Sequence, residues 1–521
     1  MTPPHAIEVS PADEFNKKLV ENAHPSDWTN PTPAGRYNLV VVGAGTAGLV
    51  AAAGGAILGG RVALIERALT GGDCLNYGCV PSKALIRAAR AAHAVTEARE
   101  FGIETQPPMV EFADVMRRVR RVRAEIAPND SVQRFAGLGV DMFLGHGHFT
   151  GKHSLEVEGQ RLDFRKAIIA VGGRAAVPPI PGLAEAGYLT NETVFSLTAL
   201  PRRLIVIGGG PIGCELAQAF ARLGSQVSLV SDVPRLLPKE DPDVAALLEQ
   251  QFQREGIEII LGAKVGRAEK SAVGKILIVN RGQKNETVVG DEILLAAGRV
   301  PNVEGLNLEA AGVKYDEKGV TVDDHLRTSN KSIFAAGDIG SPFHFTHAAE
   351  ALGRIALQNA LFFGRKRASD LVIPWCTYTD PEIAHVGLNQ EGTSKSGMET
   401  EKFQLPFAEN DRGVVDNDTK GFARVHVRRK DGKLLGATLV SRHAGESIGE
   451  LVMAIQQKMK VGELGAVIHP YPTEAEIIKR LGDASQRGRL KPWMKQALVK
   501  IFQWRRSERG LARLHASVKK P

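Results

Sequence analysis

The sequence predicts an α/β protein in which a parallel sheet flanked by helices occurs twice and is followed by a smaller α+β domain. Two short apolar runs, at 39–42 and 204–207, each end in glycine and lead into an alanine-rich helical stretch. Strands that alternate with such helices form βαβ units on a parallel sheet. Beyond about residue 372 the pattern changes to two short strands and a helix, at 421–428, 434–440 and 447–459.

Other segments complete this outline. Residues 1–36 are polar and rich in proline, so we expect an N-terminal extension or arm. A charged segment at 109–127 predicts a helix, and an apolar run at 167–173 predicts a buried strand that ends in glycine. The outline therefore contains two nucleotide-binding domains and a third, mixed domain.

Length and composition exclude several classes of protein. The chain has 521 residues, of which 43% are hydrophobic and 24% charged, which is ordinary for a globular protein. Four cysteines in so long a chain do not form a secreted disulfide framework. The sequence has no apolar run of about 18 residues, as a transmembrane helix requires, and residues 1–18 do not resemble a signal peptide. We therefore expect an intracellular, cytoplasmic protein.

The net charge of +8 is concentrated at one end of the chain. Residues 479–521 contain 13 Lys or Arg and two acids, so they carry +11, and the remaining residues carry −3. The basic character belongs to a tail and not to the body. No nucleic-acid-binding fold is recognisable, so we expect no nucleic-acid partner.

The first glycine motif follows the first predicted strand. Gly43, Gly45 and Gly48 form a G-x-G-x-x-G pattern that leads into a helix. Such glycines permit a tight turn and a close approach of the backbone to a pyrophosphate at the helix N-terminus. Glu66 ends the next predicted strand, where an acid binds a ribose. Together these features predict a dinucleotide site.

The second glycine motif repeats the pattern at Gly208, Gly210 and Gly213. Ser231 occupies the strand end where an acid is expected. A carboxylate there would repel a 2′-phosphate, so its absence favours NADPH. Asp232 is adjacent and no arginine lies beside it, so NADH stays an alternative.

The third motif is a cysteine pair, Cys74 and Cys79, followed by Lys83. Two cysteines could be half of a metal site, but no second pair completes four ligands, and we predict no metal site. Pro81 suits the first turn of a helix, so Cys79 lies just before a helix N-terminus with Lys83 nearby. Both features favour a thiolate. We interpret the pair as a redox-active disulfide beside a flavin, with neutral buried thiols as the alternative.

These three motifs and their spacing resemble the class I flavin-dependent pyridine nucleotide–disulfide oxidoreductases over roughly residues 37–480. This family includes dihydrolipoamide dehydrogenase, glutathione reductase and mercuric reductase. The resemblance implies FAD as cofactor and NAD(P)H as electron donor. It further implies roles for Gly172, Gly337 and Asp338 at FAD, for Gly298 at NAD(P)H, and for an ion pair of Lys83 with Glu215 beside the flavin.

The resemblance also implies a domain order and a homodimer. We expect an extension (1–36), an FAD domain with a Rossmann-like fold (37–186), a similar NAD(P)H domain (187–297), a central domain (298–370), an interface domain (371–485) and a basic tail (486–521). In the implied mechanism, electrons pass from NAD(P)H through the flavin to the disulfide. Cys79 then becomes the charge-transfer thiolate and Cys74 attacks the substrate.

One site departs from the family pattern. In relatives that handle dithiols, an H-P-T-x-x-E segment of the partner subunit supplies a histidine base. Here Tyr471 and Glu476 align with its histidine and glutamate, and His469 lies two residues upstream of the tyrosine. A phenol is a poor base near neutral pH but can donate a hydrogen bond or help ligate a metal ion. This argues against lipoamide or glutathione disulfide as an efficient substrate.

Mercuric reductases also have tyrosine at this position, so they are the members of the family that the chain resembles most. The substrate we predict is a metal ion or a small oxidised compound. The C-terminal cysteine pair of mercuric reductases is missing, since no cysteine follows Cys376. Cys376 replaces an aliphatic strand residue and is interpreted as a core residue or as a third thiol near the site. Cys214 is interpreted as helix packing. Dihydrolipoamide dehydrogenase-like or other disulfide reductase activity stays an alternative.

The tail predicts a basic amphipathic helix. Its apolar residues form one helical stripe, namely Trp493, Met494, Ala497, Leu498, Ile501 and Phe502. Basic residues flank the stripe. Such a helix either docks on the enzyme's own surface or lies in an anionic membrane interface. The second possibility makes the protein a membrane-peripheral electron-transfer enzyme.

Overall fold

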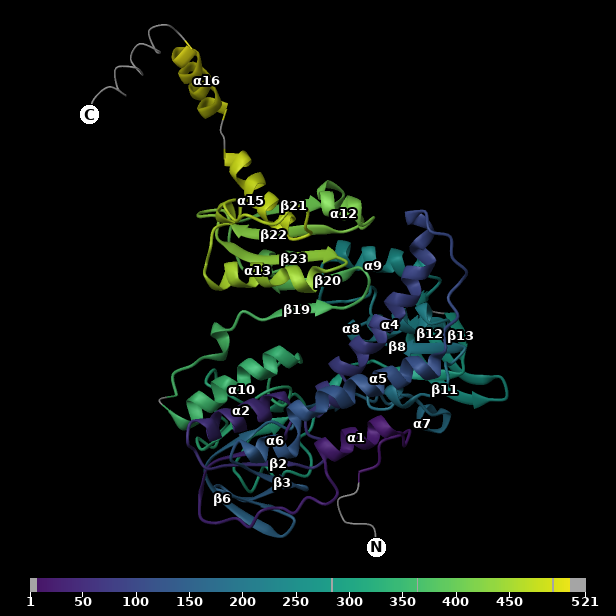
Figure 1. Cartoon of the computed structure of the whole chain (residues 1–521), viewed down its shortest axis with the longest axis vertical. Helices are drawn as coiled ribbons and strands as arrows, with labels where there is room; N and C mark the ends of the chain where they lie inside the picture. Colours follow the sequence, from purple (N-terminus) through teal and green to yellow (C-terminus); the bar gives the residue numbers. More distant parts are fainter. Residues whose placement is uncertain (1–6, 283, 363, 490–491, 507–521) are drawn as a thin grey trace, which may run out of the picture. The chain divides into compact units, whose positions relative to one another are not determined.

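The computed structural model describes residues 7–282, 284–362, 364–489 and 492–506. The chain forms two compact units (Figure 1), of which the first comprises Met1–Leu371 with Thr377–Thr379 and the second Val372–Cys376 with Asp380–Pro521. The first unit contains two separate sheets with parallel central strands, the first of which also has antiparallel strands at one edge, and the second unit contains a five-stranded sheet with helices. The predicted α/β class with an additional mixed domain is confirmed.

The first sheet of the larger unit has seven strands. They are β1 (Tyr37–Val42), β2 (Val62–Glu66), β3 (Val140–Leu144), β4 (His148–Gly151), β5 (Ser154–Val157), β6 (Gln160–Ile169) and β18 (Ile333–Ala335). They run in the order β3-β2-β1-β6-β5-β4, and β18 also pairs with β6. β1 is central and parallel to both neighbours, with Val40 opposite Ala63 of β2 and Ala167 of β6. The carboxyl ends of β1, β2, β6 and β18 therefore lie at one edge.

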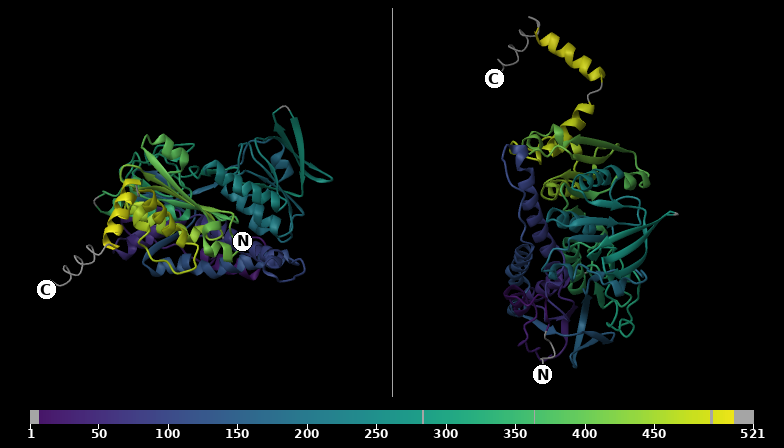
Figure 2. Two further views of the ribbon diagram at one scale, coloured as in Figure 1. Left: turned by 90° about the horizontal axis from the view of Figure 1, so that it is seen from above. Right: turned by 90° about the vertical axis from the view of Figure 1, so that its right-hand side faces the viewer.

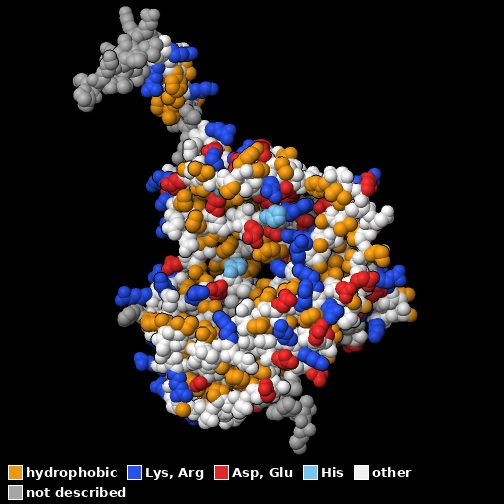
Figure 3. All heavy atoms as spheres, in the orientation of Figure 1, with side chains coloured by type: hydrophobic (Ala, Val, Ile, Leu, Met, Phe, Trp, Pro, Cys, Tyr) orange, Lys and Arg blue, Asp and Glu red, His pale blue; other side chains and the backbone are white. Residues whose placement is uncertain are grey.

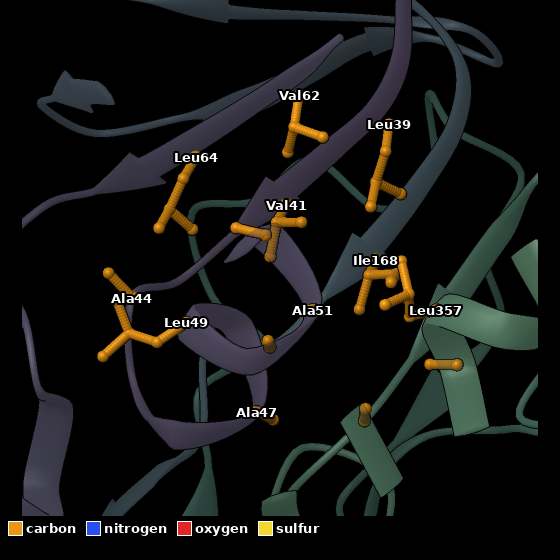
Figure 4. Packing of buried hydrophobic residues seen from close by; sticks show 14 of the residues in the cluster. Leu39, Val41, Ala44, Ala47, Leu49, Ala51, Val62, Leu64, Ile168 and Leu357 are labelled. Atoms are coloured by element: carbon orange, nitrogen blue, oxygen red, sulfur yellow. The ribbon is translucent and has the colours of Figure 1, made fainter. Parts of the chain in front are cut away.

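Two helices cover one face of this sheet, α2 (Thr46–Ile57) and α10 (Thr346–Leu361). Both are rich in small residues, which lets them pack closely on each other and on the sheet. Figure 4 shows strand side chains converging with those of the helices, including Leu39, Val41, Val62, Leu64, Leu49 and Leu357. A second apolar cluster covers the other face, around Phe143, Phe164 and Val320.

The second parallel sheet has four strands in the order β10-β9-β8-β14. They are β8 (Arg203–Ile207), β9 (Gln226–Val230), β10 (Glu258–Ile260) and β14 (Glu292–Leu295). A three-stranded antiparallel sheet of long strands lies beside it (Figure 2), made of β11 (Lys264–Ser271), β12 (Gly274–Arg281) and β13 (Lys284–Gly290). Two helices follow strands of the parallel sheet, α8 (Pro211–Arg222) after β8 and α9 (Pro242–Arg254) after β9.

The second unit is built on one sheet in the order β19-β20-β23-β22-β21. Its strands are β19 (Pro374–Thr377), β20 (Glu382–Gly387), β21 (Thr400–Pro406), β22 (Phe422–Arg428) and β23 (Leu434–Ser441). The helices α13 (Ala444–Gln456) and α15 (Glu476–Arg489) pack on it. The strands predicted at 421–428 and 434–440 are confirmed. The helix predicted at 447–459 begins three residues earlier, because His443 and not a later residue ends the turn after β23.

The remaining elements are short or connect the sheets. The helices are α1 (Glu14–Ala23), α3 (Gly72–Asn76), α4 (Cys79–Glu97), α5 (Phe112–Ile126), α6 (Val132–Gly137), α7 (Leu183–Ala186), α11 (Gln390–Lys395), α12 (Asp411–Val415), α14 (Val461–Leu464) and α16 (Pro492–Arg506). The 3-10 turns are Ala98–Phe101, Ala127–Asp130, Val194–Ser196, Ala368–Asp370 and Phe407–Glu409. The small ladders pair β7 (Gly173–Ala175) with β15 (Arg299–Pro301) and β16 (Tyr315–Asp316) with β17 (Gly319–Val320).

In its described part, residues 7–36, the N-terminal extension packs on the larger unit and does not project as an arm. Asp13 caps α1 by accepting hydrogen bonds from the backbone N–H groups of Phe15 and Asn16. The helix packs along α5, and the indole N–H of Trp28 donates to the carbonyl of Met142 at 3.1 Å. The sequence analysis missed this helix because prolines surround it and few of its residues are apolar.

The C-terminal helix α16 confirms the helix predicted for the tail. None of its residues, 492–506, is buried. Figure 3 shows hydrophobic and basic side chains together on its surface. Residues 507–521 of the predicted tail lie outside the described residues. No helix in the described part of the chain is both long and apolar enough to cross a membrane.

Candidate active site

The cysteine pair lies on two short consecutive elements. Cys74 is the middle residue of α3, and Cys79 is the first residue of α4 and not the residue before it. Gly71 adopts φ +86°, where a side chain would also collide with Leu75, so the chain can turn sharply into α3. Cys74 is half-buried and Cys79 exposed, and both are free thiols. The fold thus presents two thiols beside a helix N-terminus.

The two thiols differ in acidity. A hydrogen bond from Cys74 lowers the pKa of the Cys79 thiol to about 6, although the protein atoms around the sulfur partly desolvate it and oppose this shift. The hydroxyl of Thr346, at 3.2 Å from the Cys79 sulfur, and the Lys83 ammonium lower the same pKa further. The hydrogen bond and burial raise the pKa of Cys74. Cys79 is therefore the thiolate of the pair and Cys74 the thiol that holds the proton.

Lys83 and Glu215 form an ion pair at 2.7 Å, from α4 and α8. Glu215 is 6% exposed, and its second oxygen accepts a hydrogen bond from the Tyr378 backbone N–H at 2.8 Å. The Lys83 ammonium also lies 4.6 Å from the centre of the Tyr378 ring. A buried carboxylate with two partners fixes the direction of the lysine. The structure thus brings together the two charges that the sequence analysis paired by resemblance.

The first glycine turn has the geometry that a bound dinucleotide needs. Gly43 adopts φ +102°, and a Cβ at Gly48 would overlap the carbonyl oxygen of Gly43. A Cβ at Gly45 would meet only Gly72, at 3.8 Å, so it would fill the space above the helix N-terminus. Glu66 is buried at the end of β2 and accepts a hydrogen bond from the Ala44 N–H at 2.6 Å. The backbone cradle and the carboxylate fit FAD.

The second turn repeats the cradle with a different strand end. A Cβ at Gly213 would overlap the carbonyl oxygen of Gly208, whereas a Cβ at Gly210 would have no described atom within 4 Å. Ser231 is buried, and its hydroxyl accepts a hydrogen bond from the Gly209 N–H at 3.2 Å. The cradle at Gly210 fits the pyrophosphate of a nicotinamide dinucleotide.

Arg235 is a cation on the loop after β9 that the sequence analysis did not single out. One of its terminal nitrogens donates to the Pro238 carbonyl at 3.0 Å. Its Nε is buried and has no hydrogen-bond partner among the described residues. A guanidinium with a donor to spare suits an anionic group. Arg235 could have been found from the sequence, because it lies four residues after Ser231.

Three further glycine positions lie at strand ends or beside a small ladder of the larger unit. Gly172 follows β6, Gly337 follows β18, and Gly298 precedes β15, all with positive φ. Asp338, next to Gly337, is half-buried, and burial raises the pKa of its carboxyl group. Gly298 is exposed, Gly172 is half-buried and Gly337 is buried, and Asp338 adds one carboxylate beside them.

Arg299 joins Asp338 to the cysteine loop. Its Nε lies 3.6 Å from the carboxylate of Asp338, and its Nη2 lies 3.3 Å from that of Asp73, the neighbour of Cys74. Asp73 also accepts a hydrogen bond from the Asn191 side chain at 2.8 Å. The sequence analysis missed Arg299, Asp73 and Thr346, because side-chain pairing between distant segments has no local pattern.

The segment with Tyr471 lies in the second unit and makes its own contacts. The Tyr471 hydroxyl donates to Asp411 at 2.8 Å, which raises the pKa of the phenol above its ordinary value of 10.0. Tyr471 is 70% exposed. Glu476, which the sequence analysis aligned with the orienting glutamate, begins α15. Tyr471 is therefore hydrogen-bonded to Asp411 and is a weaker acid than a free phenol, so its phenolate is even less populated near neutral pH.

Two histidines of this unit are paired with glutamates. His469 Nε2 lies 2.9 Å from Glu450, and its side chain is only 6% exposed, which is typical of a structural histidine. His443 Nδ1 lies 2.7 Å from Glu474. Burial alone would raise the pKa of Glu474, but hydrogen bonds from His443 and Ser441 lower it. The sequence analysis did not single out His443.

The other two cysteines pack in apolar surroundings. Cys214 is completely buried in α8, and burial raises the pKa of its thiol. Cys376, on β19, packs against the apolar core of the second unit. The pKa shift of Cys214 is therefore opposite to that of Cys79.

Two dinucleotide cradles and a cysteine pair with one acidic thiol define a flavin- and nicotinamide-dependent disulfide oxidoreductase. The chain belongs to the pyridine nucleotide-disulphide oxidoreductase family, whose model matches residues 37–353, and whose dimerisation domain matches residues 373–481. Members of this family are FAD-dependent with NAD(P)H as electron donor. The family, fold class and cofactors expected from the sequence are confirmed.

Curated relatives have two different activities. A mercuric reductase of Bacillus cereus is 33% identical over 444 residues, which cover 85% of this chain and 70% of the relative. A dihydrolipoyl dehydrogenase of Thermus scotoductus is 35% identical over 461 residues, covering 86% of this chain and 97% of the relative. Sequence identity alone therefore does not distinguish the two activities.

Solved structures have the same fold. LpdA of Mycobacterium tuberculosis has a TM-score of 0.79 and 26% identity, covering 86% of this chain and 99% of that one. The Cu(II) complex of the HOCl-induced flavoprotein disulfide reductase RclA of Escherichia coli has a TM-score of 0.77 and 28% identity, covering 85% of this chain and 98% of that one.

Proposed function

We propose that the protein uses NADPH to reduce a metal ion, or another small oxidised compound, through Cys74 and Cys79. The observation that carries the proposal is the asymmetry of the two thiols, with the pKa of Cys79 lowered to about 6 and that of Cys74 raised. At pH 7 Cys79 is mostly thiolate, and this state is lost as the pH falls through 6. A redox-active cysteine pair needs one thiolate and one thiol, and Cys79 and Cys74 supply these two groups.

The chain's residues support each part of this reaction. FAD, when bound, supplies hydride transfer from the nicotinamide and relays an electron pair to the disulfide. Reduction of the Cys74–Cys79 disulfide by two electrons and one proton breaks the S–S bond and leaves a thiol on Cys74 and a thiolate on Cys79. Thr346 and Lys83 stabilise that thiolate. Transfer of two electrons to the substrate re-forms the disulfide and releases the proton.

Tyr471 favours a metal ion over a disulfide substrate. Release of two thiols from a disulfide needs a group that shuttles protons near neutral pH. The Tyr471 hydroxyl donates a hydrogen bond to Asp411, which raises the pKa of the phenol, so Tyr471 is unsuited to that task. Reduction of a thiol-bound metal ion needs no such shuttle. The names of the mercuric reductases and of the Cu(II) complex of RclA support the same class of substrate.

The roles we propose for the other residues follow the family pattern. FAD would be held by Gly43, Gly45, Gly48, Glu66, Gly172, Gly337 and Asp338, and the nicotinamide dinucleotide would be held by Gly208, Gly210, Gly213, Ser231 and Gly298. The neutral Ser231 favours NADPH over NADH, and Arg235 adds a positive charge to the loop after β9. The family's dimerisation domain at residues 373–481 supports a homodimer.

The test is spectroscopic and then kinetic. Two-electron reduction of the holoenzyme by NADPH is expected to produce a long-wavelength charge-transfer band, which Cys79→Ser abolishes and Cys214→Ser leaves unchanged. Absence of the band in the wild type would refute the redox role of the pair. NADPH consumption is then measured with mercuric ion, Cu(II), lipoamide, glutathione disulfide, quinones and oxygen. Rapid turnover of lipoamide would refute the argument from Tyr471.

We propose separately that α16 attaches the enzyme to an anionic membrane surface. Its apolar residues are exposed, with Trp493 at 63% and Phe502 at 53%. Lys495 and Arg506 flank the stripe on one side, at helical spacing from Val499. An apolar stripe with tryptophans beside a basic face fits the interface of anionic lipids. The +11 charge of residues 479–521 supplies the electrostatic attraction.

A matched pair of substitutions tests the membrane proposal. Leu498→Glu places a charge in the stripe, and Val499→Glu places the same charge on the basic face. We expect the full-length enzyme to co-sediment with phosphatidylglycerol vesicles, Leu498→Glu to lose at least about tenfold in binding and Val499→Glu to lose less. Equal losses, or no binding by the wild type, would refute the proposal. A change in oligomeric state in Leu498→Glu would instead assign the stripe to a second copy of the chain.

A further inference from the structure

Residues 11–24 lie outside the segment that the family model matches, yet they contact the loop that carries the cysteine pair. The loop runs from residue 68 to residue 79 and contains α3. The contacts come from α1, from the turn after it, and from α5, against which α1 packs. All of these elements belong to the larger unit.

The backbone of the loop is held at its start. The Thr70 N–H donates to the carbonyl of Ala23 at 3.0 Å, and the Thr70 hydroxyl donates to the same oxygen at 3.2 Å. His24 Nδ1 lies 2.5 Å from the carbonyl of Ala68. Thr70 is completely buried and His24 nearly so. The entry to α3 is therefore paired with the N-terminal segment inside the protein.

The end of α3 is held through an arginine. Arg123 of α5 is 2% exposed and donates from Nη1 to the carbonyl of Asn76 at 2.7 Å. Its Nη2 donates to Oδ1 of Asn16 in α1 at 2.6 Å. The Asn76 side chain in turn donates to the carbonyls of Thr70 and Gly72, at 3.0 and 2.8 Å. One fork thus ties α1 to the last residue of α3.

The burial of Arg123 is unfavourable for the stability of the fold. Desolvation lowers the pKa of Arg123 to about 10, and its Nε has no hydrogen-bond partner among the described residues. A buried guanidinium that is only partly satisfied costs stability. The two bonds that it does make both lead to the connection between α1 and α3. The arrangement is therefore better suited to fixing a position than to stabilising the fold.

Apolar packing joins the same elements. Leu19 of α1, Leu75 of α3 and Ala127 form a buried cluster, with Val80 of α4 packed against it. Leu75 is adjacent to Cys74, and Val80 is adjacent to Cys79. A change in the position of α1 would therefore reach the backbone next to both sulfurs.

We propose that residues 11–24 position the redox loop: Asn16, through Arg123, and Leu19, through Leu75, hold α3 so that Cys74 stays within hydrogen-bond reach of Cys79. This inference rests on the proposed redox role of the cysteine pair. Asn16 and Leu19 are positioning residues, since they touch neither sulfur. Loss of either is expected to weaken the Cys74–Cys79 hydrogen bond and make Cys79 less acidic.

The experiment follows the pH at which the charge-transfer band of the two-electron-reduced, full-length holoenzyme is half-formed, which reports the Cys79 thiolate. Asn16→Ala is expected to raise this pH by about one unit, because the thiolate loses part of its hydrogen bond. Asn16→Asp keeps an oxygen for Arg123 and is expected to stay near the wild type. Glu21→Ala, on the exposed side of α1, is the control and is expected to leave the pH unchanged.

The outcomes separate this inference from the proposed function. If the wild type forms no band, the proposed redox role fails. If the band forms normally and Asn16→Ala lowers only the thermal unfolding temperature, α1 is merely structural and the positioning role is refuted. Should Asn16→Ala not fold, Leu19→Val is measured in the same way, and an unchanged half-formation pH refutes the role. The groups that face Cys79, namely Cys74, Lys83, Glu215 and Thr346, are the same in every variant.

Discussion

The two glycine-rich turns of the larger unit have nearly the same backbone. Gly43 and Gly208 both have positive φ, +102° and +122°, directly after a central parallel strand. A Cβ on the third glycine, Gly48 or Gly213, would overlap the carbonyl oxygen of the first in each turn. The helix in each case approaches the strand so closely that only hydrogen fits.

The strand ends beside these turns differ. Glu66 binds the Ala44 N–H with a carboxylate at 2.6 Å, and Ser231 binds the equivalent Gly209 N–H with a hydroxyl at 3.2 Å. One turn is thus closed by a buried charge and the other by a neutral group. The comparison teaches that the glycines determine the shape of a dinucleotide site, while one side chain sets the charge that the nucleotide meets.

The largest expected effect breaks the shared shape. In Gly213→Ala the new methyl group displaces α8 from β8, which we expect to lower the free energy of unfolding by about 3 kcal/mol. We further expect reduction of bound flavin by NADPH to slow at least a hundredfold, on the order of 3 kcal/mol. Thermal unfolding and stopped-flow absorbance of the holoenzyme measure the two effects.

Gly210→Ala is the matched control for that substitution. Its methyl group would have no described atom within 4 Å, and the backbone at Gly210 has φ −79°, which any residue adopts. Stability should change by less than about 0.5 kcal/mol, while NADPH binds about tenfold more weakly because the methyl group occupies the cradle. Equal destabilisation by the two variants would contradict the shape argument.

The next prediction tests the charge at the strand end beside the second glycine turn. Ser231→Glu gives the second turn the carboxylate of the first, which repels a 2′-phosphate and accepts hydrogen bonds from an unphosphorylated ribose. We expect kcat/KM to shift towards NADH by about a hundredfold relative to NADPH. Steady-state kinetics with both nucleotides measure the ratio. A preference for NADH in the wild type would overturn the proposal before the variant is made.

The shared parts of the two turns were predictable from the sequence, because each depends on a strand, three glycines and one strand-end residue close together in the chain. The same holds for the cysteine pair on α3 and α4. Arg299, Thr346 and Asn16 were not predictable, since each acts on the cysteine loop from a segment far away in sequence. Such contacts depend on tertiary packing, which leaves no periodic signal.

The N-terminal helix α1 is the clearest example of an element that the sequence did not predict. Its buried face contains Asn16 and Leu19, and one of these is polar. The sequence analysis searched for apolar periodicity. It did not predict α1, because this helix is held by a hydrogen bond between Asn16 and Arg123 and by the packing of Leu19. Position 471 is the converse case: one residue in a recognisable segment predicts a change in chemistry, and the structure adds that its hydroxyl is hydrogen-bonded to Asp411.

The smallest expected effect sharpens the contrast between the two strand ends. Glu66→Gln keeps one acceptor oxygen but leaves one of two backbone N–H groups, of Ala44 or Ala68, facing an amide donor. Ser231→Ala removes a single neutral acceptor from the Gly209 N–H. We expect losses of about 2 kcal/mol and about 1 kcal/mol in the free energy of unfolding, since hydrogen bonds to charged groups contribute more. Denaturant titration of the FAD-free protein measures both, and a larger loss in Ser231→Ala would show that the two strand ends are not held in the way their geometry implies.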